Sequence, residues 1–154
     1  RSTLFPYTTL FRSRSWRFPM PKCRIENEKR ARQLVRFDGM DFNNKGFTDI
    51  DAVMDWHGRA WLMFEVKGRG RELTTGQRIL AEHFVGMAGD SGRYAVAVVV
   101  EHGVRDCKRD VLLSECEVVE LYDTKGMAWR PPREPMTAKE LARRFVQYVR
   151  GPRI

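Results

Sequence analysis

The feature that most constrains the fold is a pair of strand-like segments joined by a short turn. Residues 60–67 are apolar nearly throughout, which is typical of a central strand covered on both sides, yet they include Glu65 and Lys67. Residues 47–56 precede them, and the His-Gly-Arg tripeptide at 57–59 favours a β-hairpin. The chain must therefore place two charged side chains on a strand whose other residues favour burial.

The register of this hairpin decides which side chains share a face. With a three-residue loop at 57–59, Asp51 lies opposite Glu65 and Asp49 lies opposite Lys67, because side chains alternate along a strand. Directly opposed side chains have Cβ atoms about 5 Å apart, close enough for two carboxylates to share one cation. A two-residue loop would shift the register by one and put the acids on opposite faces.

Three acids and a lysine on one sheet surface predict a ligand. Like charges repel, and a hard dication such as Mg²⁺ or Mn²⁺ removes that cost because it takes oxygen ligands. Asp49, Asp51 and Glu65 are the expected ligands, with Lys67 beside them. The alternative is a solvated polar face on a two-stranded ribbon. We favour a site because Glu65 interrupts an apolar strand.

The remaining periodicity predicts an α/β fold with a mixed sheet flanked by helices. The expected order is α-β-β-β-α-β, followed by one more strand and one more helix. Thr75 is the expected N-cap of the central helix, and the Thr137-x-x-Glu140 capping box opens the last helix. Besides the hairpin, the expected elements are a helix at 22–36, a short strand at 36–40, a helix at 75–88, strands at 93–101 and 117–122, and a helix from 137 that ends at Gly151.

The net charge of the chain predicts an anionic partner, but part of that charge lies in the first 19 residues. The formal net charge is +8, but residues 1–19 carry four arginines and no acid, so residues 20–154 carry +4. Residues 3–13 are similar to a translated sequencing adapter, and we expect residues 1–19 to be a non-native tail on a single domain at 20–154. Three scattered cysteines fit a reducing cytoplasm, and no apolar run reaches the ~18–20 residues that span a bilayer.

The motifs at 48–51 (T-D-I-D) and 64–67 (F-E-V-K) resemble the PD-(D/E)XK nuclease superfamily, which includes phage, restriction-endonuclease-like and Holliday-junction-resolvase-like members. A Gly/Arg-rich loop at 68–71 and T-G-Q at 75–77 extend the similarity. The resemblance covers about residues 26–101 and implies a restriction-endonuclease-like αβββαβ core. Thr48 stands where the family name has proline, and the doubled acid leaves open whether Asp49 or Asp51 is the main ligand.

The resemblance also assigns roles to residues outside the two motifs. It implies that Glu28 and the carbonyl of Val66 complete a Mg²⁺ or Mn²⁺ site, and that Gln77 orients Lys67 or contacts DNA. A favourable charge near a helix N-terminus explains Glu28 equally well. A first-turn polar residue beside the cap is an equally weighted interpretation of Gln77. Phosphate contacts are the natural use of the three flanking cations, Lys45, Arg69 and Arg71, with a solvated loop as the alternative.

The resulting expectation is a Mg²⁺-dependent endo- or exodeoxyribonuclease that hydrolyses phosphodiester bonds. DNA is favoured over RNA as its partner, and a homodimer is compatible with the sequence. The alternative from another class is a non-catalytic nucleic-acid-binding or protein-interaction module on the same fold. An unrelated α/β domain with coincidental motifs is the third reading, and a two-residue hairpin loop would favour it.

Removal of residues 1–19 tests the expected tail. Because the segment lacks a sustained helical or strand period, its deletion should leave the melting temperature and any activity unchanged. Thermal unfolding of both chains measures this directly. A melting temperature lowered by several degrees would show that the segment packs on the domain.

Overall fold

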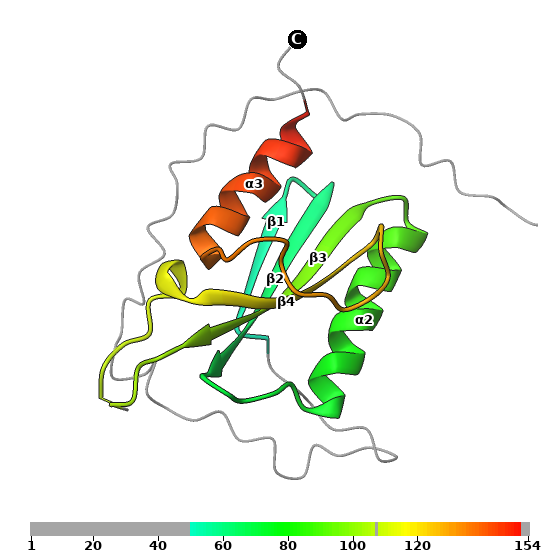
Figure 1. Cartoon of the computed structure of the whole chain (residues 1–154). Helices are drawn as coiled ribbons and strands as arrows, with labels where there is room; N and C mark the ends of the chain where they lie inside the picture. Colours follow the sequence, from blue (N-terminus) through cyan, green and yellow to red (C-terminus); the bar gives the residue numbers. More distant parts are fainter. Residues whose placement is uncertain (1–49, 107, 152–154) are drawn as a thin grey trace, which may run out of the picture. The chain divides into compact units, whose positions relative to one another are not determined.

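The computed structural model describes residues 50–106 and 108–151, which form an α/β domain with a mixed sheet (Figure 1). In chain order the elements are β1 (Ala52–Trp56), β2 (Ala60–Gly68), α2 (Thr75–Asp90), β3 (Tyr94–His102), the short 3₁₀ helix η1 (Leu113–Glu115), β4 (Glu117–Asp123) and α3 (Ala138–Arg150). No helix among these residues is long and apolar enough to cross a membrane.

The four strands lie in the order β1-β2-β3-β4, so β2 and β3 are the inner pair. β1 and β4 pair antiparallel with their neighbours, whereas β2 and β3 pair parallel from Ala60↔Tyr94 to Gly68↔His102. Parallel neighbours need a crossover connection, which α2 supplies here. The carboxyl ends of β2 and β3 therefore meet at one edge of the sheet.

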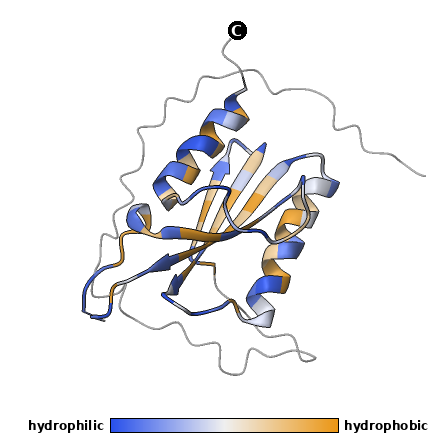
Figure 2. Cartoon of the chain, viewed as in Figure 1, coloured by the Kyte–Doolittle hydropathy of each residue, from blue (hydrophilic) through white to orange (hydrophobic). Residues whose placement is uncertain are grey.

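Alternation along the inner strands produces two cores, one on each face. Leu62 and Phe64 belong to the cluster packed against α3, whereas Met63 belongs to the cluster packed against α2. Figure 1 shows the two helices on opposite sides of the sheet, and Figure 2 shows the hydrophobic colouring of the inner strands. Burial on both faces explains why β2 and β3 are nearly continuous apolar runs.

Of the described helices, α2 and α3 each begin with a complete capping box. Thr74 caps α2, and its side chain accepts from the backbone N–H of Gln77, whose own side chain accepts from the Thr74 N–H. Thr137 and Glu140 form the same reciprocal pair at the start of α3. Such a pair satisfies two backbone donors that a helix terminus otherwise leaves open.

The predicted hairpin loop and most predicted elements are confirmed, with shifted ends. Trp56 pairs with Ala60, so the loop has three residues and the register is the one that puts positions 51 and 65 opposite each other. The prediction of Thr75 as an N-cap is wrong, because Thr74 holds that position and α2 continues to Asp90. The capped final helix and its end at Gly151 are as predicted. The expected elements at 22–36 and 36–40 lie outside the described residues.

A buried carboxylate fixes the chain after β4. Asp123 has a side chain that is 7% exposed and pairs with Arg130, and it also accepts from the backbone N–H groups of Lys125 (2.9 Å) and Gly126 (2.8 Å). Burial alone raises the pKa of Asp123, but the hydrogen bonds from Gly126, Arg130 and Lys125 outweigh it, so this pKa lies below its usual value. The ionised carboxylate therefore holds the turn that follows β4.

Asp123→Asn should lower the free energy of unfolding at pH 7 by about 1–3 kcal/mol, since the donors of Lys125, Gly126 and Arg130 lose their charged acceptor. The native pKa is depressed, so this contribution is complete above the unfolded value of about 3.9 and disappears as pH falls through the native value. Urea unfolding at several pH values measures the difference. The exposed Asp110→Asn is the matched control, and an identical pH dependence for both variants would contradict the assignment.

Candidate active site

The two charged residues of β2 lie on the face that carries α2, close to the start of that helix. Alternation puts Glu65 and Lys67 on the same side as Met63, which packs against α2. Their side chains are only 8% and 16% exposed, and Glu65 is one of two buried charged residues among those described. Buried charges need partners, because an isolated ion loses its hydration without compensation.

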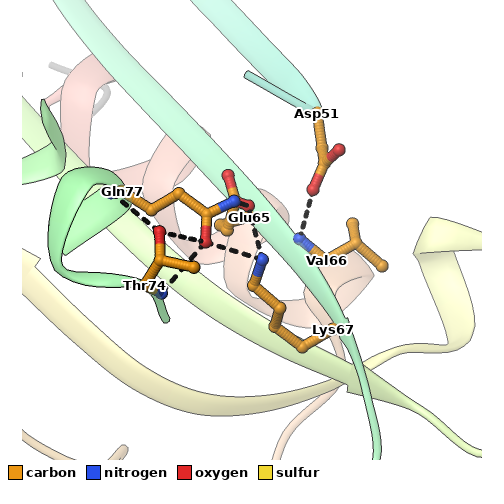
Figure 3. Close-up of polar contacts among 6 residues, drawn as sticks. All are labelled: Asp51, Glu65, Val66, Lys67, Thr74 and Gln77. Carbon is orange, nitrogen blue, oxygen red and sulfur yellow. Dashed lines mark hydrogen bonds and ion pairs between the residues drawn. The ribbon is translucent and has the colours of Figure 1, made fainter. Parts of the chain in front are cut away.

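Those partners form a compact network between β2 and the first turn of α2 (Figure 3). The Lys67 Nζ atom lies 2.9 Å from Glu65 Oε1 and 2.8 Å from Gln77 Oε1, and it donates to both. The Gln77 Nε2 group donates to the same Glu65 oxygen in a short hydrogen bond. Thr74 donates to Gln77 Oε1 from its N–H (3.1 Å) and its hydroxyl (3.2 Å). The glutamine is therefore oriented from both ends.

The lysine retains capacity for a ligand. An ammonium group has three donors and no acceptor. Within the described part of the chain, Lys67 uses two donors, on Glu65 and Gln77. One N–H therefore remains for water or an anionic ligand, and the two bonds that are made hold the charge in place.

Asp51 contacts β2 along the edge at which β1 pairs with it. It lies in a bend directly before β1, and its Oδ2 atom accepts from the backbone N–H of Val66 at 2.7 Å. The β1 ladder ends at the Ala52↔Phe64 pair, so this carboxylate takes the place of the carbonyl that a longer strand would offer. Figure 3 shows it turned to the Val66 N–H, whereas Glu65 is turned to Lys67 and Gln77. Asp51 and Glu65 thus flank one stretch of backbone.

The structure brings three of the predicted residues into one network, places two more beside it, and leaves others outside the described residues. Glu65, Lys67 and Gln77 form the network, and Asp51 contacts the backbone N–H of Val66, the residue between Glu65 and Lys67. The prediction placed residues 47–51 in a strand, but Ile50 and Asp51 precede β1 among the described residues. Three predicted residues, Glu28, Lys45 and Asp49, lie outside the described residues.

The candidate metal ligands are oxygen atoms, the atom type that a hard dication binds. Asp51, Glu65 and the Val66 carbonyl are the oxygen ligands that Mg²⁺ or Mn²⁺ prefers. Across residues 50–106 and 108–151 no three His, Cys, Asp or Glu side chains converge as a metal-binding group. Mg²⁺ commonly takes one or two protein carboxylates and completes its shell with water and substrate phosphate. Asp51 and Glu65 are two such carboxylates by residue type, and each already accepts a hydrogen bond from a protein donor.

The predicted cations Arg69 and Arg71 follow the site directly and are exposed. Arg69 lies 3.5 Å from Glu117, with both side chains about two-thirds exposed, which is a weak surface pair. Sequence reasoning missed Thr74, the residue that orients Gln77. The signal was present, because threonine followed three residues later by glutamine is itself a capping-box pattern.

No protein-family model, curated protein or solved structure matches this chain.

Asp51→Asn should leave the free energy of unfolding within about 0.5 kcal/mol of wild type, because an amide oxygen can still accept from Val66. Asp51→Ala removes that acceptor and should cost about 0.5–1.5 kcal/mol. Urea unfolding without divalent ions isolates this role from metal binding. An asparagine variant as unstable as the alanine variant would show that the Val66 contact is not what Asp51 contributes to folding.

Proposed function

We propose that this protein is a metal-dependent nuclease of the PD-(D/E)XK type, which hydrolyses phosphodiester bonds in DNA. The proposal includes the restriction-endonuclease-like core. The described order from β1 to β3, with α2 between the parallel strands, is compatible with the β-β-α-β part of that core.

One observation carries the proposal: a nearly buried lysine and glutamate two residues apart on an inner strand, oriented by a glutamine from the next helix. Lys67 and Glu65 contact each other at 2.9 Å, and Gln77 contacts both. Groups held in this way need little rearrangement when a substrate arrives, which is how preorganised sites lower a reaction barrier. A merely solvated sheet face would not bury them.

In the proposed reaction a water oxygen attacks phosphorus, and the bond from phosphorus to the leaving oxygen breaks. Lys67 donates its remaining N–H to a phosphate oxygen or to the attacking water, and counters the added negative charge. Glu65 and Gln77 hold the ammonium group at that position. Asp51, Glu65 and the Val66 carbonyl would hold Mg²⁺ or Mn²⁺, with Asp49 and Glu28 as further expected ligands. When bound, the dication supplies a water of lowered pKa and positive charge beside the phosphate.

A second candidate function is a non-catalytic nucleic-acid-binding or protein-interaction module. The observation that favours it is the Glu65–Lys67 pair, because a carboxylate that already accepts from an ammonium group and an amide has protein partners for its charge. Such a pair can have a purely structural use. Metal titration and cleavage assays separate the two functions.

Substitution of each charged residue on β2 should separate metal binding from chemistry. Glu65→Gln should weaken Mg²⁺ binding and abolish cleavage together, because it removes a charged ligand. Lys67→Ala should keep metal binding and DNA affinity near normal but lower the cleavage rate about 10²–10³-fold, the scale for loss of one electrostatic or acid–base group. Calorimetric Mg²⁺ titration and single-turnover cleavage of labelled duplex, single-stranded and branched DNA measure both properties.

Lys139→Ala is the matched control, since it removes one exposed lysine on α3, a helix that covers the other face of the sheet. Circular dichroism of every variant tests whether the fold is intact. Wild-type protein that binds nucleic acid but shows no divalent-dependent cleavage of any DNA or RNA form would establish the non-catalytic module instead.

A further inference from the structure

A groove lies where the carboxyl ends of β2 and β3 meet. It has a volume of about 520 Å³ and lies between the loop that follows β2 and the loop that follows β3. We call it the arginine groove, and its lining residues are Gly68, Arg69, Arg71, His102, Gly103, Val104 and Arg105. Ligands of open α/β sheets commonly bind outside the carboxyl ends of parallel strands.

Hydrogen bonds of the loop that follows β2 fix the shape of the groove. The Arg69 N–H donates to the His102 carbonyl at 3.0 Å, which continues the parallel pairing by one bond beyond the strands. The Arg71 N–H donates to the Gly68 carbonyl at 2.9 Å and turns the first loop back on itself. Gly70 has φ +76°, a conformation that favours glycine, and its N–H donates to Glu101 at 3.3 Å. The walls are thus positioned before a ligand binds.

The charge of the lining is one-sided. Three of its residues are arginines, and among the described residues that line it none is acidic. His102 adds a donor, because its Nδ1 accepts from the Val104 N–H at 3.2 Å and the ring proton is thereby assigned to Nε2. Within the described part of the chain, neither Arg71 nor Arg105 forms an ion pair. These donors favour an anion with several oxygens, such as phosphate.

A neighbouring cavity of about 470 Å³ differs from the arginine groove in the charge of its lining. The two share five lining residues: Arg69, His102, Gly103, Val104 and Arg105. Beyond these, the cavity adds one arginine, Arg109, and four acidic residues: Glu101, Asp106, Glu115 and Glu117. A phosphate is repelled from that acidic side and attracted to Arg71 at the other. Arg71 belongs to the loop that begins directly after Lys67 and Gly68. The lining of the groove therefore begins at Gly68, one residue after Lys67 in the chain.

We propose that the arginine groove binds a phosphate group of the nucleic-acid strand next to the phosphate at Lys67, and so positions the strand for cutting. The inference rests on the proposed nuclease function and adds to it His102 and Arg105, from the loop after β3. The phosphate can come from the interior of a strand or from its end. Contacts of this kind fix the position of the strand and carry no sequence information.

The test is a double substitution, Arg71→Ala with Arg105→Ala, in the full chain. These two arginines are exposed and unpaired within the described residues, so their loss should leave the fold intact, whereas Arg69 also contacts Glu117. The matched control is Lys139→Ala with Arg143→Ala, which removes the same charge from exposed positions on α3. Fluorescence anisotropy without added divalent ions measures binding of labelled DNA that ends in a 5′-phosphate or a 5′-hydroxyl.

The groove variant should bind DNA about tenfold or more weakly than the control, with a salt-dependence slope shallower by about one. An equal loss on both DNA ends assigns the groove to an interior phosphate, and a loss only on the 5′-phosphate assigns it to a strand end. A groove variant that binds like the control overturns the inference, even if wild type cleaves DNA. Cleavage by wild type is scored separately, so failure of the nuclease function leaves the binding result readable.

Discussion

The parallel pairing of β2 with β3 is the constraint on which the other features depend. Because these strands are inner and covered on both sides, they must be apolar, and the helices must lie on opposite faces of the sheet. Because they run parallel, α2 has to cross over between them: it begins shortly after the end of β2, and the chain after it returns to the start of β3, beside the start of β2. Their carboxyl ends also coincide, so the loops at Gly68 and Gly103 face one another. The candidate site and the arginine groove are both products of this geometry.

Burial of Glu65 and Lys67 is hard to explain by stability alone. Removal of two charges from water costs several kcal/mol for each ion, and a buried pair recovers this only when its geometry is good and further hydrogen bonds assist. Gln77 supplies that assistance by donating to the acid and accepting from the base. Apolar residues would fill the same space without such cost. The arrangement is better explained by a use for the charges, which is the physical basis of the nuclease proposal.

The sequence left two hairpin registers open, and the three-residue loop at 57–59 is the one observed. Burial could not choose between them, because β2 is apolar on both faces and a shift by one residue would still bury it. The types of the described elements followed from the sequence, because buried strands show continuous apolar runs and amphipathic helices show helical spacing. The contacts of Asp51 did not follow, because a carboxylate can replace a backbone carbonyl at a strand end, and side-chain alternation gives no sign of such an exchange. The arginine groove was half predicted: Arg69 and Arg71 are adjacent to the site in sequence, whereas His102 and Arg105 approach them only through the parallel pairing.

The two interpretations of Gln77 left open by the sequence prove to be compatible. As the third helical residue of α2, it completes the capping box with Thr74, and with the same Oε1 atom it accepts from Lys67. The start of α2 therefore fixes the Gln77 amide beside β2, and the amide oxygen in turn positions the Lys67 ammonium group. Glutamate would serve the cap equally well, but its carboxylate would have no donor for Glu65 and would repel it. Capping alone does not distinguish the two residues, whereas a partner that must donate to an acid and accept from a base requires the neutral amide.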